Sequence, residues 1–364
     1  MIPLVNLKRQ YETLKPEIDA AVADVITRQE FIHGSKVKAF TASWLAALGA
    51  QHGTGCANGT VAISAALRAL GVGAGDEVIT TAHTFFATVE AIFAVGATPV
   101  FADIDPRTYN IDVATTGATP RTKAILPVHL YGNAADMDAV MAFATKHRLK
   151  VIEDTAQAHL GTFSGRTLGT IGDVGTFSFY PGKNLGAYGD AGFIVARDGA
   201  VGAKIAKLVD HGRESKYSHD VIGDNLRMDE IQAAVLSVKL RRLAAWTARR
   251  QAVAHRYEAR LKAGGFKTIV PHKGGSCVYH LYVVEVSNRD EVLEALKAKG
   301  IGAGVHYPLP LHRQPALKNH PCATVSLPHT ERAATRVISL PICADITDDE
   351  VRRVMDAFLS CAKP

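Results

Sequence analysis

The sequence predicts an α/β protein in which a large domain holds a mainly parallel sheet sandwiched by helices and a small C-terminal domain is α+β. From about residue 50 to residue 196, short β-rich runs alternate with helical patterns. Such alternation favours a parallel sheet, because parallel strands need crossover connections. After residue 229 a long helical segment leads out of this region. We therefore expect a large domain over residues 1–249 and a small domain over residues 250–364.

The elements of the large domain follow from the hydrophobic periodicity. Two amphipathic helices are expected on either side of FIHGSKV (31–37), as an arm that packs on the body or on a partner subunit. Strands are predicted at DEVITT (76–81), TPVFADI (98–104), KAILPVHL (123–130), KVIED (150–154), GTFSFY (175–180) and GFIVA (192–196). Helices are predicted at TFFATVEAIFAVG (84–96) and AADMDAVMAFATKHR (134–148).

The C-terminal elements follow a different pattern. Residues 229–263 have apolar positions at helical spacing without Gly or Pro, which predicts one long helix or two in succession. A strand-like CVYHLYVVEV (277–286), a helical DEVLEALKAKG (290–300), a strand-like IGAGVHYPLP (301–310) and a helical DDEVRRVMDAFLSCA (348–362) come after it.

Composition excludes several classes of protein. Apolar residues make up 47% of the 364, enough for a packed core, and the net charge of +6 comes from interspersed charges and not from a basic stripe typical of nucleic-acid binders. The most apolar window, residues 91–104, is broken by Gly96, Pro99 and Asp103, so no membrane span is expected. The five cysteines lack metal-binding spacing. With Lys8 and Arg9 preceding any apolar run, we expect a cytoplasmic protein without a metal.

The first motif with chemical potential is CANGT, in which Asn58, Gly59 and Thr60 open a helix. A glycine lets main-chain N–H groups approach a ligand, and the helix N-terminus attracts an anion such as a phosphate. The same residues are also typical of a simple helix cap.

The second motif is KVIEDTAQAH, which leaves Asp154 at the carboxyl end of a strand and Gln157 three residues further on. A buried carboxylate needs a cation or hydrogen-bond donors. The alternative is that Asp154 caps a following helix.

The third motif is FSFYPGKNLGAYGDAGF, which places Ser178 and a lone Lys183 after a strand. In addition, Phe85 follows the strand at 76–81 and could stack on a planar ring or belong to the core. Ligands of parallel sheets bind outside the carboxyl ends of the strands, where all these residues are expected.

Together these features call for a ligand with a phosphate, a flat ring, a basic ring nitrogen and a group that captures an amine. Pyridoxal 5′-phosphate has all four. Its aldehyde forms a Schiff base with a lysine, and an aspartate keeps its ring nitrogen protonated. Lys183 would be the covalent anchor and the base that moves the substrate proton, and Asp154 the ring partner.

The motifs CANGT, EDTAQAH, SFYPGKNLGAYGDAG, GDNLRMDEIQAA and VHYPLPLH, in this order, closely resemble the DegT/DnrJ/EryC1/StrS family of sugar-nucleotide aminotransferases, which have the aspartate-aminotransferase fold (fold type I). The resemblance runs from FIHG to SLPICADIT. It implies that Lys183 is the Schiff-base lysine, Asp154 the pyridinium partner and Gln157 a neighbour of the cofactor hydroxyl. It also implies phosphate contacts for Gly59, Thr60 and Ser178, and ring stacking for Phe85.

The resemblance further implies a homodimer, because Asn225 matches an asparagine that reaches the phosphate of the neighbouring subunit's cofactor. Family members act on keto sugars carried by dTDP or UDP, with L-glutamate as the usual amino donor. Substrate contacts are expected from Arg213, Lys216 and Tyr217, or these form an ordinary solvated loop. His306 and Tyr307 resemble a segment near the sugar pocket.

The form of the stretch after Lys183 resembles aminotransferases that act at C3 of a 3-keto-6-deoxyhexose more than those that act at C4. A UDP-linked 3-keto sugar fits the same residues. One rival is an amino-acid transaminase, whose substrate carboxylate Arg227 or Arg313 could hold. A second rival is a non-catalytic sensor or scaffold, against which the buried lysine and carboxylate argue.

Overall fold

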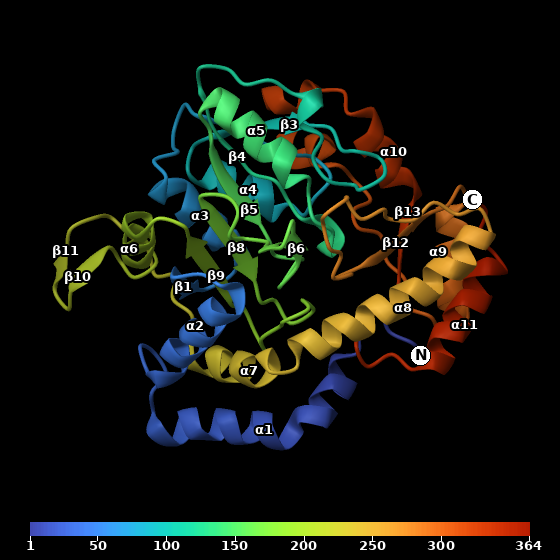
Figure 1. Cartoon of the computed structure of the whole chain (residues 1–364), viewed down its shortest axis with the longest axis horizontal. Helices are drawn as coiled ribbons and strands as arrows, with labels where there is room; N and C mark the ends of the chain where they lie inside the picture. The colour runs from blue at the N-terminus through green and yellow to red at the C-terminus, as the bar shows by residue number, and fades with distance from the viewer.

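The computed structural model describes residues 1–364, and its centre is a seven-stranded sheet in the order β1-β9-β8-β5-β4-β2-β3 (Figure 1). The strands are β1 (His52–Cys56), β2 (Glu77–Thr81), β3 (Thr98–Ala102), β4 (Thr122–Ile125), β5 (Lys150–Asp154), β8 (Val174–Ser178) and β9 (Gly192–Ala196). Only β9 runs antiparallel to its neighbours. The predicted mainly parallel sheet is therefore confirmed.

Helices cover both faces of this sheet. Apolar side chains such as Ile152, Val174 and Ile194 share a core with one set of helices, and the alternate residues Val151, Phe177 and Phe193 pack toward the other set. The first set is α3 (Gly59–Ala69), α4 (Ala87–Ala94) and α6 (Gly199–Leu208). The second set is α2 (Ser35–Leu48), α5 (Met137–His147) and α7 (Glu230–Leu240).

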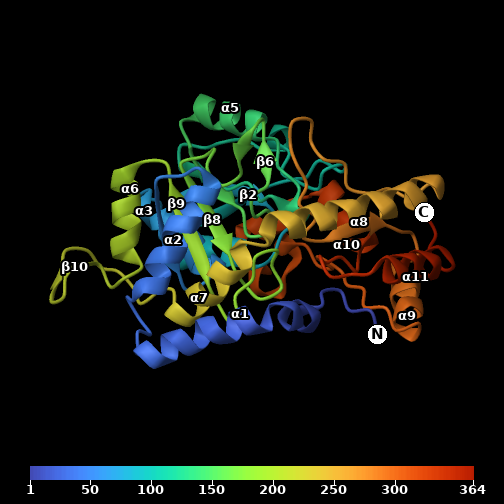
Figure 2. The same ribbon diagram turned by 60° about the horizontal axis from the view of Figure 1, so that its bottom comes forward.

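The N-terminal arm is the predicted pair of helices, α1 (Leu7–Arg28) and α2. Figure 2 shows α1 lying along α7 on the outside of the body. Leu14 and Ile18 of α1 are buried against Val235 and Val238 of α7. Each of the two helices alone would expose an apolar stripe, so their packing follows from their amphipathic pattern.

The C-terminal part has its own apolar core, to the right of the sheet in Figure 1. It contains α8 (Leu243–Ala263), β12 (Tyr282–Glu285), α9 (Arg289–Ala298), β13 (Val337–Leu340) and α11 (Asp348–Leu359). Ile2 also contributes to this core and bridges to Ile301. The segment at 229–263 forms two helices in succession, α7 and α8. Helix α8 runs without a break across residue 250, the predicted domain boundary. The division at that residue stays a prediction.

One expected strand is wrong. Residues 301–310 form only two isolated bridges, from Ile301 to Ile2 and from Gly304 to Ser339. Pro308 and Pro310 lack the N–H groups that a longer ladder needs. The partner of β12 is instead β13, which is antiparallel to it and which the sequence analysis did not identify.

Three further features complete the fold. A short hairpin, β10 (Arg213–Ser215) with β11 (Ser218–His219), projects away from the body beyond α6 (Figures 1 and 2). Helix α10 (Pro328–Arg336) follows a segment with buried Leu311, Leu317 and Leu327, which pack against Ala82 and Val89 of the large sheet region. None of the helices is both long and apolar enough to cross a membrane.

Candidate active site

The candidate site lies at the carboxyl edge of the sheet, where Asp154 ends β5 and Ser178 ends β8. Both side chains lie on the sheet face that α3 and α4 cover. Asp154 is two residues after Ile152 and Ser178 four residues after Val174, and residues an even number apart in a strand point to the same face. Asp154 is buried. Its carboxylate accepts hydrogen bonds from Thr88 Oγ1 on α4 at 3.2 Å and from the Ala156 N–H at 3.1 Å. No helix follows β5, so Asp154 is not a helix cap.

Lys183 is half-buried in the loop between β8 and β9 and interacts electrostatically with Asp154. Burial lowers the pKa of the Lys183 amine from its ordinary 10.5 to about 8, although the Asp154 charge opposes this change. Burial likewise raises the pKa of the Asp154 carboxyl, against its hydrogen bond from Ala156 and the Lys183 charge. The site therefore holds a partly neutral amine near pH 8 beside an acceptor carboxylate.

The loop that carries Lys183 is closed by main-chain bonds. The Lys183 N–H donates to Tyr180 O at 2.8 Å, and the Ala187 N–H donates to Phe179 O at 2.7 Å. Asn184 is buried, and its Nδ2 donates to Val278 O at 3.0 Å. The position of Lys183 is thus set by contacts on both sides of it in the chain.

The N-terminus of α3 forms a cradle beside Ser178. Asn58 caps the helix, since its Oδ1 accepts the Val61 N–H at 3.0 Å, and this leaves the N–H groups of Gly59 and Thr60 without an intrahelical acceptor. A Cβ on Gly59 would come within 2.8 Å of Ser178 Cβ. Asn58 is therefore the helix cap, and the missing side chain of Gly59 lets the start of α3 lie against Ser178. The anion site stays a prediction.

His159, on the chain segment after β5, contacts the main-chain carbonyl of Ser178. His159 Nε2 lies 2.9 Å from Ser178 O, and the ring packs against Trp44, Phe177 and Phe179. Burial lowers the pKa of His159 to about 3. A neutral ring therefore donates its Nε2–H to the carbonyl, a contact that sequence reasoning missed although EDTAQAH contains this histidine.

Gln157 is buried and has a fixed amide orientation. Its Oε1 accepts the Tyr131 main-chain N–H at 2.7 Å, so its Nε2 is the atom that donates to Tyr307 OH at 3.2 Å. The Tyr307 ring lies 6.0 Å from the ring of Phe85, which is 57% exposed. The structure therefore brings Gln157, Phe85 and Tyr307 together, with an exposed aromatic face available to a planar ligand.

Two residues behind this group were not singled out from the sequence. Tyr131 OH donates to His306 O and lies 2.7 Å from His83 Nε2, which must then carry the proton. Burial lowers the pKa of His83 to about 4, so this ring is neutral. His306 is also held by Ser339 Oγ, 2.9 Å from its Nδ1. The run VHLYG contained Tyr131, but no periodicity distinguishes it from a core residue.

The remaining predicted residues lie away from Lys183 in this chain. Arg213, Lys216 and Tyr217 belong to the projecting β10–β11 hairpin, and Tyr217 is 84% exposed (Figure 1). Asn225 is exposed and bridges to Asp210 at the base of this hairpin. The three hairpin residues do not lie at the carboxyl edge of the sheet within one chain. Asn225 precedes Leu226, whose carbonyl accepts the Ala57 N–H at 2.7 Å between β1 and α3.

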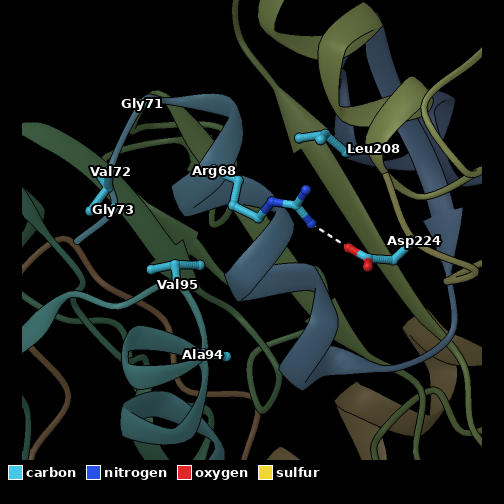
Figure 3. Close-up of a pocket in the computed structure, with 8 residues that line it drawn as sticks. All are labelled: Arg68, Gly71, Val72, Gly73, Ala94, Val95, Leu208 and Asp224. Carbon is cyan, nitrogen blue, oxygen red and sulfur yellow. Dashed lines mark hydrogen bonds and ion pairs between the residues drawn. The ribbon is translucent and has the colours of Figure 1, made fainter. Parts of the chain in front are cut away.

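A separate surface hollow of about 670 Å³ lies at the opposite edge of the sheet (Figure 3). Its lining comes from the ends of α3 and α4 and from the loops before β2 and β3, and Arg68 pairs with Asp224 across it. Helices α3 and α4 run from the carboxyl edge back to the amino edge, so their C-termini are remote from Asp154. This hollow contains none of the predicted site residues.

The residues at the carboxyl edge fit pyridoxal phosphate. The N–H groups of Gly59 and Thr60 at the start of α3, together with the Ser178 hydroxyl, are donors suited to a phosphate. Buried Asp154 suits a protonated ring nitrogen, and the lowered pKa of Lys183 suits an amine that attacks an aldehyde.

Several known proteins are similar in sequence to this chain along nearly its whole length. The model of the DegT/DnrJ/EryC1/StrS aminotransferase family matches residues 12–359. A pleiotropic regulatory protein of Geobacillus stearothermophilus is 46% identical over 98% of this chain and 97% of its own. A UDP-N-acetyl-3-dehydro-alpha-D-glucosamine 3-aminotransferase of Acidithiobacillus ferrooxidans is 42% identical, covering 97% and 96%. A dTDP-3-amino-3,4,6-trideoxy-alpha-D-glucose transaminase of Streptomyces venezuelae is 41% identical, covering 100% and 96%.

Solved structures agree with these relatives. DesV of S. venezuelae, in complex with a ketimine intermediate, superimposes with a TM-score of 0.96 at 40% identity, over 99% of this chain and 98% of its own. NtdA of Bacillus subtilis with bound cofactor PMP gives a TM-score of 0.90 at 32% identity, over 98% and 82%. The predicted fold class is thereby confirmed, and this chain belongs to the DegT/DnrJ/EryC1/StrS aminotransferase family.

Proposed function

We propose that this chain is a pyridoxal-phosphate-dependent transaminase that aminates a nucleotide-linked keto sugar, at C3 of a 3-keto hexose, with L-glutamate as amino donor. The observation that carries the chemistry is the half-buried Lys183 beside the buried Asp154, with the pKa of Lys183 lowered to about 8. The names of two relatives, which act on UDP- and dTDP-linked sugars at position 3, support the substrate class and the regiochemistry.

When bound, pyridoxal phosphate supplies an aldehyde for amines and a protonated ring that withdraws electrons from the carbon bearing the amine. The Lys183 amine would hold that aldehyde and, when free, would carry a proton to and from the substrate carbon. Asp154 would keep the ring nitrogen charged. Gly59, Thr60 and Ser178 would bind the phosphate, Gln157 would donate to the ring hydroxyl, and Phe85 would stack on the ring.

We assign substrate binding to two chains of a homodimer. Tyr307 lies beside Gln157 and Phe85 within one chain, and it and the preceding His306 contact the sugar. Arg213, Lys216, Tyr217 and Asn225 reach the neighbouring chain's site, where the cations meet the diphosphate and Asn225 the cofactor phosphate. The projection and exposure of the hairpin support this arrangement (Figure 1). We place the reaction in the cytoplasm, because all five cysteines are free thiols.

Shared sites can be tested by complementation. Lys183→Ala and Asn225→Ala should each be inactive as pure proteins. Co-refolded or co-expressed in equal amounts, they should recover about a quarter of the normal activity, because half of the dimers are hybrids with one intact site each. A mixture as inactive as its components contradicts the assignment of Asn225 to the partner's site.

The amino-acid transaminase is disfavoured by one of the two arginines that it would use. Arg227 Nη1 lies 3.7 Å from Asp210 Oδ1, and Arg313 Nη2 lies 2.8 Å from Glu331 Oε1. Arg313 is hydrogen-bonded to this carboxylate and is therefore not a free clamp for a substrate carboxylate. Arg227 lies as far from Asp210 as Arg213 does, so its ion pair does not distinguish the two functions. A non-catalytic sensor is disfavoured by the retained Lys183, Asp154 and Gln157, because a buried amine and carboxylate do not help a scaffold fold.

The test uses the two half-reactions. The protein loaded with pyridoxal phosphate is first converted to its aminated form by L-glutamate and then offered dTDP- or UDP-linked 3-keto sugars, 4-keto sugars and 2-oxo acids. We expect a 3-keto sugar nucleotide to restore the absorption of the aldehyde form, with NMR placing the new amine at C3, and among the 2-oxo acids only 2-oxoglutarate, which reverses the glutamate half-reaction, to do the same. Restoration by a 4-keto sugar would correct the regiochemistry, and restoration by 2-oxo acids alone would overturn the proposal.

A further inference from the structure

Helix α7 contains a second buried lysine, Lys239, that no part of the reaction above uses. Its side chain is 0% exposed. It forms no salt bridge, although a fully buried lysine in a protein is nearly always paired with a carboxylate. Burial alone lowers the pKa of Lys239 to about 8. Keeping such a group in the interior is costly, which raises the question of what it binds.

Lys239 binds the loop that carries Lys183. Its Nζ donates to Gly186 O at 2.7 Å and lies 4.1 Å from the centre of the Tyr188 ring. Hydrogen bonds from charged donors are stronger than neutral ones, and an ammonium over an aromatic face adds a further attraction. Lys239 thus joins α7 to the third and fifth residues after Lys183.

A neighbouring side chain on the same face of α7 binds the same loop. Gln232 precedes Lys239 by two helical turns, and its Oε1 accepts the Tyr188 N–H at 2.9 Å. A Cβ on Gly189 would come within 2.8 Å of Gln232 Nε2, so the loop lies directly against the helix. Tyr188 also meets Tyr11 of α1 edge to face, with 6.0 Å between ring centres. Figure 2 shows α1 and α7 together on this side of the molecule.

The loop has little freedom between these points. A Cβ on Gly186 would come within 2.3 Å of Pro181 O, so the turn around Lys183 is packed against itself. On one side of the loop Asn184 donates to Val278 O, and on the other side Gly186 O accepts a hydrogen bond from Lys239. A shift of Gly186 would therefore be transmitted to Lys183, whose productive reach depends on position to within about 1 Å.

We propose that Lys239 is a positioning residue for the transaminase reaction, which fixes the loop from Lys183 to Gly189 so that the Lys183 amine meets the cofactor aldehyde. The inference rests on the proposed function only for the identity of what Lys183 captures. The hydrogen bonds from Lys239 and Gln232 to the loop form within the protein and need no ligand.

The experiment compares three variants of the full chain. Lys239→Met keeps the length and packing of the side chain but removes its donor, and Lys239→Gln keeps an N–H donor without charge. Lys204→Met is the control, because Lys204 Nζ also donates to a main-chain carbonyl, Ala69 O at 3.1 Å, but on α6 at the other edge of the molecule. Hydrogen exchange is measured on the protein without cofactor, at the amides of Lys183 and Ala187.

We expect Lys239→Met to speed this exchange about tenfold and to leave the central strands unchanged, since loss of one hydrogen bond from a charged donor shifts an equilibrium by about that factor or more. Capture of pyridoxal phosphate by Lys183, followed by its visible absorption and mapped after borohydride reduction, should slow by a similar factor. In turnover, kcat should fall while the KM for the keto sugar nucleotide stays within about threefold. Lys239→Gln should restore exchange and capture, and Lys204→Met should match the unaltered protein.

The proposal is overturned if exchange and capture in Lys239→Met equal those of Lys204→Met, or if exchange rises equally throughout the sheet, which would indicate a general structural role. Should Lys239→Met fail to fold, Lys239→Leu, which also lacks a donor, takes its place: faster exchange of the loop alone supports the proposal, and exchange equal to that of Lys204→Met overturns it. If the unaltered protein captures no pyridoxal phosphate, the proposed function fails, while the exchange data still decide whether Lys239 fastens the loop.

Discussion

Glu153 and Asp154 are consecutive residues of β5, and their carboxylates lie on opposite faces of the sheet. Glu153 accepts the main-chain N–H groups of Gly169, Ile171 and Gly172 at 2.7–2.8 Å and lies 3.1 Å from His129 Nε2. These donors lower the pKa of the Glu153 carboxyl in spite of its burial. Asp154 has only two protein donors and a raised pKa. Glu153 therefore serves the fold, whereas Asp154 retains acceptor capacity for a ligand.

Substitution of the two carboxylates should separate stability from chemistry. Asp154→Asn should leave the free energy of unfolding within about 1 kcal/mol but lower kcat about 100-fold, because a neutral amide cannot keep the ring nitrogen charged. Glu153→Gln should cost about 2–3 kcal/mol of stability, because the amide nitrogen cannot accept the main-chain donors. Urea unfolding and turnover of both variants provide the measurement. Unchanged turnover in Asp154→Asn would remove its role.

The pKa of Lys183 predicts how the protein without cofactor captures pyridoxal phosphate at different pH. Only the neutral amine attacks an aldehyde, and burial has lowered its pKa from 10.5 to about 8. The second-order rate of capture should therefore rise with pH, reach half of its maximum near pH 8 and level off at higher pH. Stopped-flow absorbance from pH 6 to above pH 10.5 gives the midpoint. A midpoint near 10.5 would mean that the Lys183 amine is as solvated as an ordinary lysine.

The cradle at the N-terminus of α3 predicts a selective effect of one methyl group. Gly59→Ala would place a Cβ within 2.8 Å of Ser178 Cβ, so Ser178 or the start of α3 must shift beside the place where a phosphate is proposed to bind. The dissociation constant of pyridoxal phosphate should therefore rise about tenfold. Gly117→Ala is the matched control, because a Cβ there meets nothing within 4 Å. Fluorescence titration of both variants distinguishes the two positions, and equal dissociation constants would argue against the cradle.

Acid stability should depend on the ion pair between α1 and α11. Arg9 Nη1 lies 2.8 Å from Glu350 Oε2, and this partner lowers the pKa of Glu350 from 4.5 to about 2. A carboxyl whose pKa is lower in the folded state stabilises it fully above pH 4.5 and loses this contribution as the pH falls toward 2. Because Arg9 is partly exposed, we expect Arg9→Met to cost about 1 kcal/mol at pH 7.

The same substitution should cost less at pH 3, since Glu350 then begins to be protonated whether or not Arg9 is present. The control is Arg352→Met, which removes the exposed Arg352–Asp349 pair and should change stability by less than about 0.5 kcal/mol at either pH. Urea unfolding at pH 7 and pH 3 measures both. An equal cost of Arg9→Met at the two values would show that packing of the arginine, and not its charge, is responsible.

The sequence by itself determined the order of helices and strands around the sheet and the identity of the residues at its carboxyl edge. Strands such as residues 150–154 and 192–196 are recognisable because a doubly covered parallel sheet requires short apolar runs between helical patterns. Lys183, Asp154 and Gln157 could be named because each follows such a run. The strand predicted at 301–310 is wrong because Pro308 and Pro310 interrupt its apolar residues. A proline prevents strand pairing only where its missing N–H would face a neighbouring strand, which the sequence does not show.

Only the tertiary structure decided how these residues are held. The orientation of the Gln157 amide comes from Tyr131, 26 positions away, and the loop of Lys183 is held by Lys239, 56 positions further along the chain. The lowered pKa of Lys183 also has no signal in the sequence, because it results from burial by segments that meet only in the fold. Periodicity reports which face of an element is buried, but not which distant group lies against it, and contacts between distant segments determine both hydrogen-bond geometry and charge state.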